Sequence, residues 1–148
     1  GWHKDLQINL FATAHLCREA ILHYLAEGGG IIVTISSHGA DMAIPMYGLV
    51  GTSKAALEAV ARHLTLEVGD AGINVNVVKA GLVDTDSTRR IPFADQLFAG
   101  REEKTMVGEH FLTADDVADC VLFLSSPLSD LIQGETITVD AGVRRTRT

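Results

Sequence analysis

The spacing of apolar and polar positions predicts three helices along the chain. Residues 4–27 and about 47–69 carry apolar side chains at helical spacing. A further helix is expected after Thr113, where Asp115 and Asp116 suit the first turn. The expected buried stripe of the first helix is Leu6, Leu10, Phe11, Ala14, Cys17, Ile21, Leu22 and Leu25, and that of the last is Val117, Val121, Leu122 and Leu124.

Between these helices the pattern predicts strands. Residues 30–37 and 73–80 are nearly unbroken apolar runs, and 133–142 form a third candidate. A run that is apolar on both faces suits a central parallel strand covered by helices on each side. Strands that alternate with helices predict an α/β fold with a doubly wound parallel sheet.

Composition and charge narrow the classes of partner and compartment. A chain of 148 residues can form one domain with a core, and its net charge of −7 argues against a nucleic-acid partner. Cys17 and Cys120 lie in apolar, helical contexts, so we interpret them as buried thiols of a reducing, cytoplasmic compartment. We find no signal peptide and no run of membrane-spanning length, and the six scattered histidines predict no metal site.

Tyr47 and Lys54 are the strongest candidates for chemistry. They are seven residues apart, and therefore two turns apart on nearly the same face of the predicted helix. The lysine charge favours a phenolate, and both groups can donate to an oxygen that gains charge. From these two residues alone, a surface tyrosine and a surface lysine remain an equal alternative.

The surrounding motifs resemble the short-chain dehydrogenase/reductase family over nearly the whole chain. Tyrosine, six residues and lysine is similar to the spacing of its enoyl-acyl-carrier-protein reductases. Commoner members have three residues between the two, which would place the tyrosine at Val50. The motifs that carry the resemblance are Ile31-Ile32-Val33-Thr34-Ile35-Ser36-Ser37, Ala43-Ile44-Pro45, Ser53-Lys54-Ala55-Ala56-Leu57-Glu58 and Ile73-Asn74-Val75-Asn76-Val77.

This resemblance implies that residues 1–148 are the C-terminal part of a single Rossmann-like, NAD(P)-binding domain whose N-terminal cofactor half is missing. The chain opens Gly1-Trp2 without a methionine, and roughly 100 residues, about one mononucleotide-binding half, are expected to precede it. The three glycines at 28–30 precede a strand, so they suit a helix-to-strand loop better than a phosphate cradle. The resemblance also implies a homotetramer through the two long helices, with core packing as the alternative.

The resemblance assigns catalytic roles to four residues. Tyr47 would donate to the substrate oxygen, and Lys54 would hold the nicotinamide ribose. Ser37 stands at the carboxyl end of a strand, where ligands bind in open α/β sheets. Asn9 would belong to the family's catalytic tetrad. The alternatives are a serine that only closes the strand and an asparagine that caps or kinks its helix.

The turn Gly81-Leu82-Val83-Asp84-Thr85 resembles the family's cofactor-binding turn. The resemblance implies that Gly81, Val83 and Thr85, with Tyr47 and Lys54, contact NADH or NADPH. A plain turn is the alternative.

Residues 86–112 lack periodicity, and such a long segment after a strand is usually a lid or binding loop. Its apolar Phe93, Leu97 and Phe98 are expected to join Ser37 and Tyr47 in holding an acyl chain. A disordered loop with a short helix is the alternative. The position of His38 suits the pocket or solvent, and we expect solvent.

The resemblance implies an oxidoreductase that reduces a trans-2-enoyl thioester, carried by acyl carrier protein or CoA, in fatty acid synthesis. A 3-oxoacyl or small carbonyl reductase is the alternative, and Asn9 and Ser37 favour it. A non-catalytic fragment or interaction module is the alternative from another class, because the chain has no phosphate cradle. We expect the isolated chain to be inactive.

Overall fold

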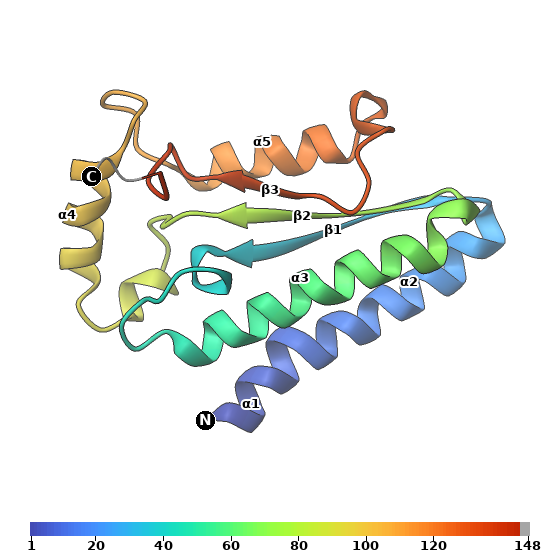
Figure 1. Ribbon diagram of the computed structural model, residues 1–148, viewed down its shortest axis with the longest axis horizontal. Helices are drawn as coiled ribbons and strands as arrows, with labels where there is room; N and C mark the ends of the chain where they lie inside the picture. The colour runs from blue at the N-terminus through green and yellow to red at the C-terminus, as the bar shows by residue number, and fades with distance from the viewer. Residues whose placement is uncertain (146–148) are drawn as a thin grey trace.

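A computed structural model describes residues 1–145, and its centre is a parallel sheet of three strands in the order β1-β2-β3 (Figure 1). The strands are β1 (Gly30–Ser37), β2 (Ile73–Ala80) and β3 (Thr136–Val139). The bounds of β1 and β2 match the prediction, whereas β3 is shorter than the range 133–142. The parallel pairing confirms the predicted fold class.

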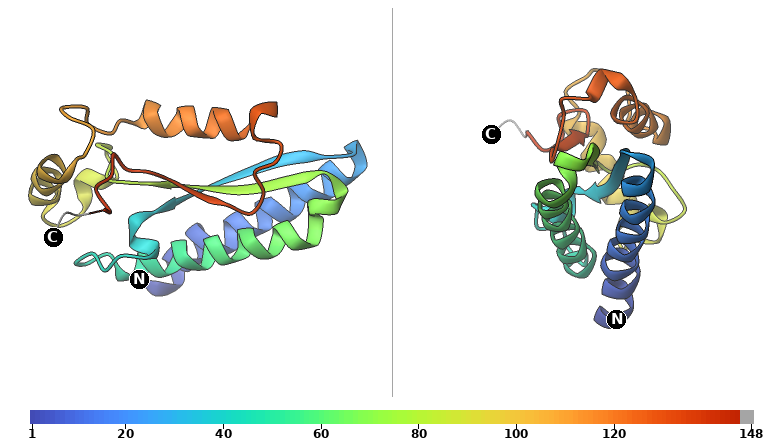
Figure 2. Two further views of the ribbon diagram at one scale, coloured as in Figure 1. Left: turned by 45° about the horizontal axis from the view of Figure 1, so that its top comes forward. Right: turned by 90° about the vertical axis from the view of Figure 1, so that its right-hand side faces the viewer.

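Helices cover both faces of the sheet (Figure 2). One face carries a long helical unit made of α1 (Trp2–Leu6), a π-helical segment (Gln7–Ala12) and α2 (Thr13–Glu27). Beside it lies α3 (Gly48–Val68), and α5 (Ala114–Leu124) covers the opposite face. The unit agrees with the long helix predicted for residues 4–27, apart from its π-helical interruption.

The main core lies between the sheet and the two long helices. β2 contributes Ile73, Val75 and Val77, all of which are nearly or fully buried. The cluster is completed by Ile32 of β1, Cys17 and Ile21 of α2, and Ala61 of α3. This is the helix-covered parallel sheet that the apolar runs predicted.

Part of the predicted apolar stripes is wrong. Phe11, Leu22 and Leu25 are about half exposed, and Leu122 of α5 is 70% exposed. A helix on a sheet buries only the side that faces the strands, and these positions extend the apolar stripe beyond that side. Leu124 is buried as expected.

The outer edge of β1 is open in the part of the chain that the structure describes, since β1 pairs with β2 alone. On the face of β1 away from the long helices, Ile35 is 42% exposed, whereas Ile32, Thr34 and Ser36 on the helix-facing side are buried. The prediction that helices cover both faces of residues 30–37 is therefore wrong within the described residues, although β2 is buried on both faces. Within residues 1–145 no helix is long and apolar enough to cross a bilayer.

All three strands point toward the same end of the molecule, where α4 (Ala94–Lys104) lies beyond their carboxyl ends (Figure 1). Residues 86–112 contain this helix and a short 3-10 turn at Thr88–Arg90. The short helix is the part of the expected alternative that the structure shows.

Candidate active site

A pocket of about 150 Å³ lies at the carboxyl ends of β1 and β2. It brings together four predicted site residues, Ser37, Tyr47, Gly81 and Leu97. Its wall also contains His38, Ile44, Leu82, Thr88, Ile91, Arg101 and Val143. The pocket is therefore built from the turns after β1 and β2, the start of α3 and the segment 86–112, as expected for an open α/β sheet.

The phenol of Tyr47 faces the end of β1. Tyr47 is the N-cap of α3, and its carbonyl accepts a hydrogen bond from the amide of Gly51 at 2.8 Å. Its Oη donates to Ser37 Oγ at 3.3 Å, and the Gly39 amide donates to the same Ser37 oxygen at 3.4 Å. Ser37 and Tyr47 thus form a hydrogen-bonded pair of hydroxyls that can donate to a substrate oxygen.

Two glycines allow this close approach. A Cβ atom on Gly39 would lie 2.6 Å from Cε1 of Tyr47 and nearer still to Cδ1. A Cβ on Gly51 would overlap the carbonyl oxygen of Gly39. The turn after β1 can therefore pack against Tyr47 and the first turn of α3 only because both residues lack a side chain.

Lys54 reaches toward the same end of β1. Its Nζ donates to the carbonyl of Ile35 at 2.8 Å, near the open edge of the strand. Burial lowers the pKa of the Lys54 amine, because the charged form loses solvation. Lys54 does not line the pocket, and its amine offers a hydrogen-bond donor at the end of β1, which is the chemistry that a ribose hydroxyl can accept.

Asn9 lies in the π-helical segment and not in the pocket wall. Its Nδ2 donates to Ser53 Oγ at 3.3 Å, and the fully buried Ser53 donates to the Val50 carbonyl at 2.7 Å. Asn9 therefore joins the first helical unit to α3 one residue before Lys54. The π-helical segment is the kind of distortion that the alternative interpretation of Asn9 expected.

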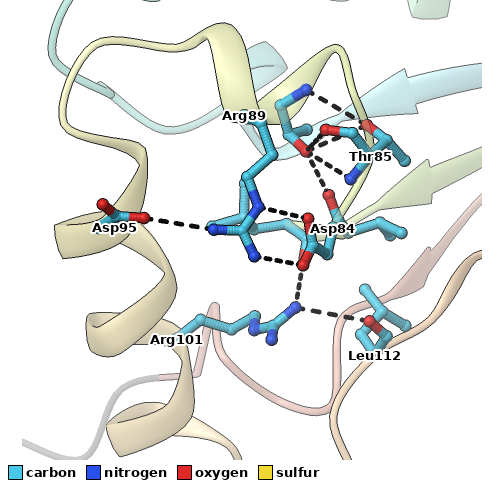
Figure 3. A network of polar contacts seen from close by, with 9 residues as sticks. Asp84, Thr85, Arg89, Asp95, Arg101 and Leu112 are labelled. Carbon is cyan, nitrogen blue, oxygen red and sulfur yellow. Dashed lines mark hydrogen bonds and ion pairs between the residues drawn. The ribbon is translucent and has the colours of Figure 1, made fainter.

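The turn after β2 is held by its own side chains. The hydroxyl of Thr88 donates to the carbonyl of Val83 at 2.6 Å and lies 3.0 Å from the hydroxyl of Thr85 (Figure 3). Of the three predicted cofactor contacts in this turn, Gly81 lines the pocket, whereas Val83 and Thr85 do not. A Cβ on Gly81 would come within 3.1 Å of both Asp140 and Leu112, so the glycine permits tight packing there.

Charged side chains hold the segment 86–112 against this turn (Figure 3). Arg89 Nε donates to Asp84 Oδ1 at 2.6 Å, and Arg89 Nη1 lies 3.2 Å from Asp95 Oδ1. The hydrogen bond from Arg89, with its positive charge, holds the pKa of Asp84 below its ordinary value. Arg101 Nη1 donates to the carbonyl of Leu82 at 2.8 Å and so ties α4 to the pocket wall.

Two of the predicted acyl-binding residues do not line the pocket. Phe98 is only 6% exposed, and its ring is contacted by the guanidinium groups of Arg89 and Arg101 at 4.5 and 5.0 Å. These cation–π contacts hold the ring inside the segment. Phe93 is 65% exposed, so its side chain lies outside the pocket. Only Leu97 of the three lies in the wall.

His38 is in the pocket wall, so the expectation that it faces solvent is wrong. It is 8% exposed, and its Nε2 lies 2.9 Å from Asp140 Oδ2, outside hydrogen-bonding geometry. Its position directly after Ser37 at the end of a strand was the available signal. Apart from Val143, the other unpredicted wall residues lie in segments already singled out, but their spacing does not distinguish them from neighbours.

Comparisons with known proteins identify the family. The model of the family described as enoyl-(acyl carrier protein) reductase matches residues 1–144. The enoyl-acyl-carrier-protein reductase (NADH) FabI of Rickettsia prowazekii is 32% identical over 142 residues, which are 96% of this chain and 53% of that protein. The chain thus spans about half the length of the curated relatives it matches.

Solved structures agree with this match. The enoyl-acyl-carrier-protein reductase of Bacillus cereus, solved with NADP+ and indole naphthyridinone, has a TM-score of 0.91 and 29% identity, over 100% of this chain and 56% of that one. A gluconate 5-dehydrogenase of Burkholderia cenocepacia has the same fold, with a TM-score of 0.90 and 23% identity over 99% of this chain and 57% of that one. The match along residues 1–144 and the tyrosine–lysine spacing together show that this chain belongs to the enoyl-acyl-carrier-protein reductases of the short-chain dehydrogenase/reductase family.

Proposed function

We propose that the full-length protein carrying this chain reduces trans-2-enoyl thioesters of acyl carrier protein or CoA in fatty acid synthesis, with NADH or NADPH. The observation that carries the proposal is the position of Tyr47 in the pocket wall, combined with the six-residue spacing between Tyr47 and Lys54. The relatives named for this activity supply the substrate class, and their names include NADH for the Rickettsia protein and NADP+ for the Bacillus structure.

The residues present fit the nicotinamide end of such a cofactor. Gly81 places backbone in the pocket wall at the carboxyl end of β2, and Lys54 offers an amine donor near the end of β1. When bound, the cofactor supplies a hydride to the β-carbon of the enoyl group. Tyr47 then donates a hydrogen bond to the thioester oxygen as that oxygen gains enolate charge. Ser37 orients the phenol, and Lys54 stabilises its charged form and holds the ribose.

The position of Tyr47 favours an enoyl substrate over a ketone. A ketone oxygen is bonded to the carbon that receives hydride, whereas the oxygen of an enoyl thioester is two bonds farther away. Val50, which takes the tyrosine position of the commoner family members, has no proton to donate. A displacement of three residues along a helix corresponds to about 4.5 Å, which is the scale of the displaced oxygen.

The competing function is a 3-oxoacyl or small carbonyl reductase. The observation that favours it is the hydrogen bond between Ser37 and Tyr47, since a serine beside the phenol also suits a ketone oxygen. The resemblance that gives Asn9 a tetrad role points the same way.

The test compares kcat/KM of the full-length protein for a trans-2-enoyl thioester and for the 3-oxoacyl thioester of equal chain length, with NADH and with NADPH. One well-placed donor is worth about 3 kcal/mol, so the enoyl substrate should be favoured roughly a hundredfold. A ratio that favours the 3-oxoacyl compound would establish the carbonyl reductase instead. Reduction of neither compound would favour the non-catalytic interaction module.

We also propose that the protein forms a homotetramer through its two long helical units. Apolar side chains on the outer side of the first unit are unburied within the described residues, namely Ile8, Phe11, Leu16, Leu22 and Leu25. Several exposed apolar side chains on one helical unit suit a contact with another copy. Light scattering on the full-length protein measures the mass of the assembly directly.

A further inference from the structure

A lysine is buried beneath the pocket between two carboxylates. Lys79 lies one residue before the end of β2, and its side chain is 5% exposed. Its Nζ lies 3.1 Å from Glu58 Oε1 on α3 and 2.9 Å from Asp41 Oδ2 in the turn after β1. Ser36 Oγ donates to the same Glu58 oxygen at 2.5 Å, and Arg144 pairs with Asp41. We call these five residues the Lys79 network.

Core packing alone does not explain this arrangement. Burying an ion pair removes both charges from water, and an apolar side chain of similar size often stabilises a core equally well. Val77 lies two residues before Lys79 and therefore on the same, helix-facing side of β2. It is a buried apolar side chain, which is the alternative to an ion pair at such a position. A role that depends on the direction of charged contacts, such as fixing one segment relative to another, would explain the Lys79 network.

The charges of the network support one another. Burial alone would raise the pKa of Asp41, but the hydrogen bond and charge of Lys79, with the charges of Arg144 and His38, hold that pKa below its ordinary value. Asp41 is thus ionised at neutral pH and paired with two cations. Glu58 faces Lys79 from α3, and Asp140 faces His38 from the turn after β3.

The network joins the segments that carry three of the four predicted catalytic side chains, Ser37, Tyr47 and Lys54. Ser36 directly precedes Ser37, and Glu58 lies one helical turn after Lys54 on α3. Asp41 lies in residues 38–46, the segment that leads into Tyr47. No member of the network lines the pocket, so its effect on a reaction there would be indirect.

Residues 41–46, which lead into Tyr47, are exposed except for Ile44. Met42 is 37% exposed, and Met46, which directly precedes Tyr47, is 78% exposed with a φ of +61°. A left-handed conformation costs a non-glycine residue free energy, so surrounding contacts must hold it in place. The ion pair between the partly exposed Asp41 and the buried Lys79 is a contact that ties this segment to β2.

We propose that Lys79 is a positioning residue that fixes residues 38–46 and α3 relative to β1, and so holds the Tyr47 phenol against Ser37. The kinetic part of this inference rests on the proposed enoyl reduction, whereas the anchoring of residues 38–46 does not.

The experiment uses the full-length protein and three variants. Lys79→Met removes the central charge, and Asp41→Asn removes only the partly exposed partner, so it keeps the test available if Lys79→Met does not fold. Val77→Ala is the matched control, because it removes packing from the same face of β2 without touching a charge. For each variant we would measure thermal unfolding, kcat and KM for the enoyl thioester, and hydrogen exchange of the amides in residues 38–47.

Both β2 variants should lower the melting temperature, but only Lys79→Met and Asp41→Asn should speed exchange in residues 38–47. Displacement of a catalytic group by about 1 Å can cost a hundredfold, so kcat should fall by up to that factor in Lys79→Met, with KM nearly unchanged. Equal kcat and equal exchange in Lys79→Met and Val77→Ala, compared at the same distance below their melting temperatures, would overturn the inference. If the unaltered protein reduces no enoyl thioester, the proposed function fails, but the anchoring of residues 38–46 can still be tested. Faster hydrogen exchange in Asp41→Asn would support that anchoring, and unchanged exchange would overturn it.

Discussion

Replacement of Gly39 by alanine should disable the pocket by moving a single ring. The new Cβ would lie 2.6 Å from Cε1 of Tyr47, whereas ordinary van der Waals contact begins at 3.4 Å. The ring must therefore retreat by nearly 1 Å, and the Gly39 backbone cannot move away because it packs against Gly51. The Tyr47–Ser37 hydrogen bond is already 3.3 Å long, so this displacement should break it.

A misplacement of about 1 Å at a reacting group can lower the rate a hundredfold, so we expect a fall of that order in kcat for the enoyl thioester. Cofactor affinity should change little, because the displaced ring is only one of the proposed cofactor contacts. The assay is steady-state reduction by the full-length variant, combined with thermal unfolding to measure the cost in stability.

Two matched glycine variants separate this effect from general damage. In Gly30→Ala the new Cβ would lie 2.6 Å from Cδ1 of Tyr24, an equal clash with an aromatic ring at the opposite end of β1. In Gly48→Ala nothing lies within 4 Å of the new Cβ, so the start of α3 should be unharmed. Only Gly39→Ala should lose turnover out of proportion to stability. If it keeps the turnover of Gly30→Ala, the ring displacement argued here does not control the reaction.

Two further predictions concern the donors and the pH dependence. Tyr47→Phe should lower kcat by about a hundredfold with little change in cofactor affinity, because the donor is needed mainly in the transition state. Lys54→Ala should lower both kcat and cofactor affinity. Steady-state kinetics and cofactor titration measure these effects, and unchanged turnover in Tyr47→Phe would remove Tyr47 from the catalytic site. Hydrogen bonds from the side chain and backbone of Thr113, with His110, lower the pKa of Asp116 to about 2. The pKa of an aspartate in the unfolded chain is about 3.9, so ionised Asp116 stabilises the folded state fully above that pH. This stabilisation is lost as the pH falls through the folded-state pKa. The melting temperature of Asp116→Asn, measured at acid pH, should therefore depend less on pH than that of the unaltered chain.

The parts of the fold that sequence could predict are those set by local periodicity. The bounds of β1 and β2 are sharp because each run of β-branched residues begins after glycine-containing turns and ends in small residues. The capping box of α5 is equally local, since Thr113 and Asp116 satisfy each other's backbone groups. The pocket position follows from the same information, because the ends of parallel strands meet at one edge.

The contacts between side chains were harder to predict than the positions of helices and strands. An apolar residue in a charged segment, such as Phe98, is expected to be buried, but its sequence does not say whether a substrate or two arginines cover it. The same uncertainty applies to Leu22 and Leu25, which are apolar but about half exposed within residues 1–145. For Lys79 the residue itself is a visible signal, because a lysine inside an apolar strand is unusual. Its partners Asp41 and Glu58 could not be predicted, since they lie 38 and 21 positions away in sequence.

The shift of the tyrosine by three residues also changes what holds it. A tyrosine at the position of Val50 would lie within α3, where helical rotamer preferences and the preceding turn restrict its side chain. Tyr47 instead is the N-cap, with φ and ψ of −109° and 2°, so its direction depends on the segment that leads into the helix. The packing of Gly39 against its ring and the anchoring of Asp41 by Lys79 therefore substitute for the helix as the means of aiming the phenol. Moving the phenol toward a more distant oxygen thus requires a rigid segment 38–46, and this requirement gives the buried charges beneath the pocket a physical reason to be there.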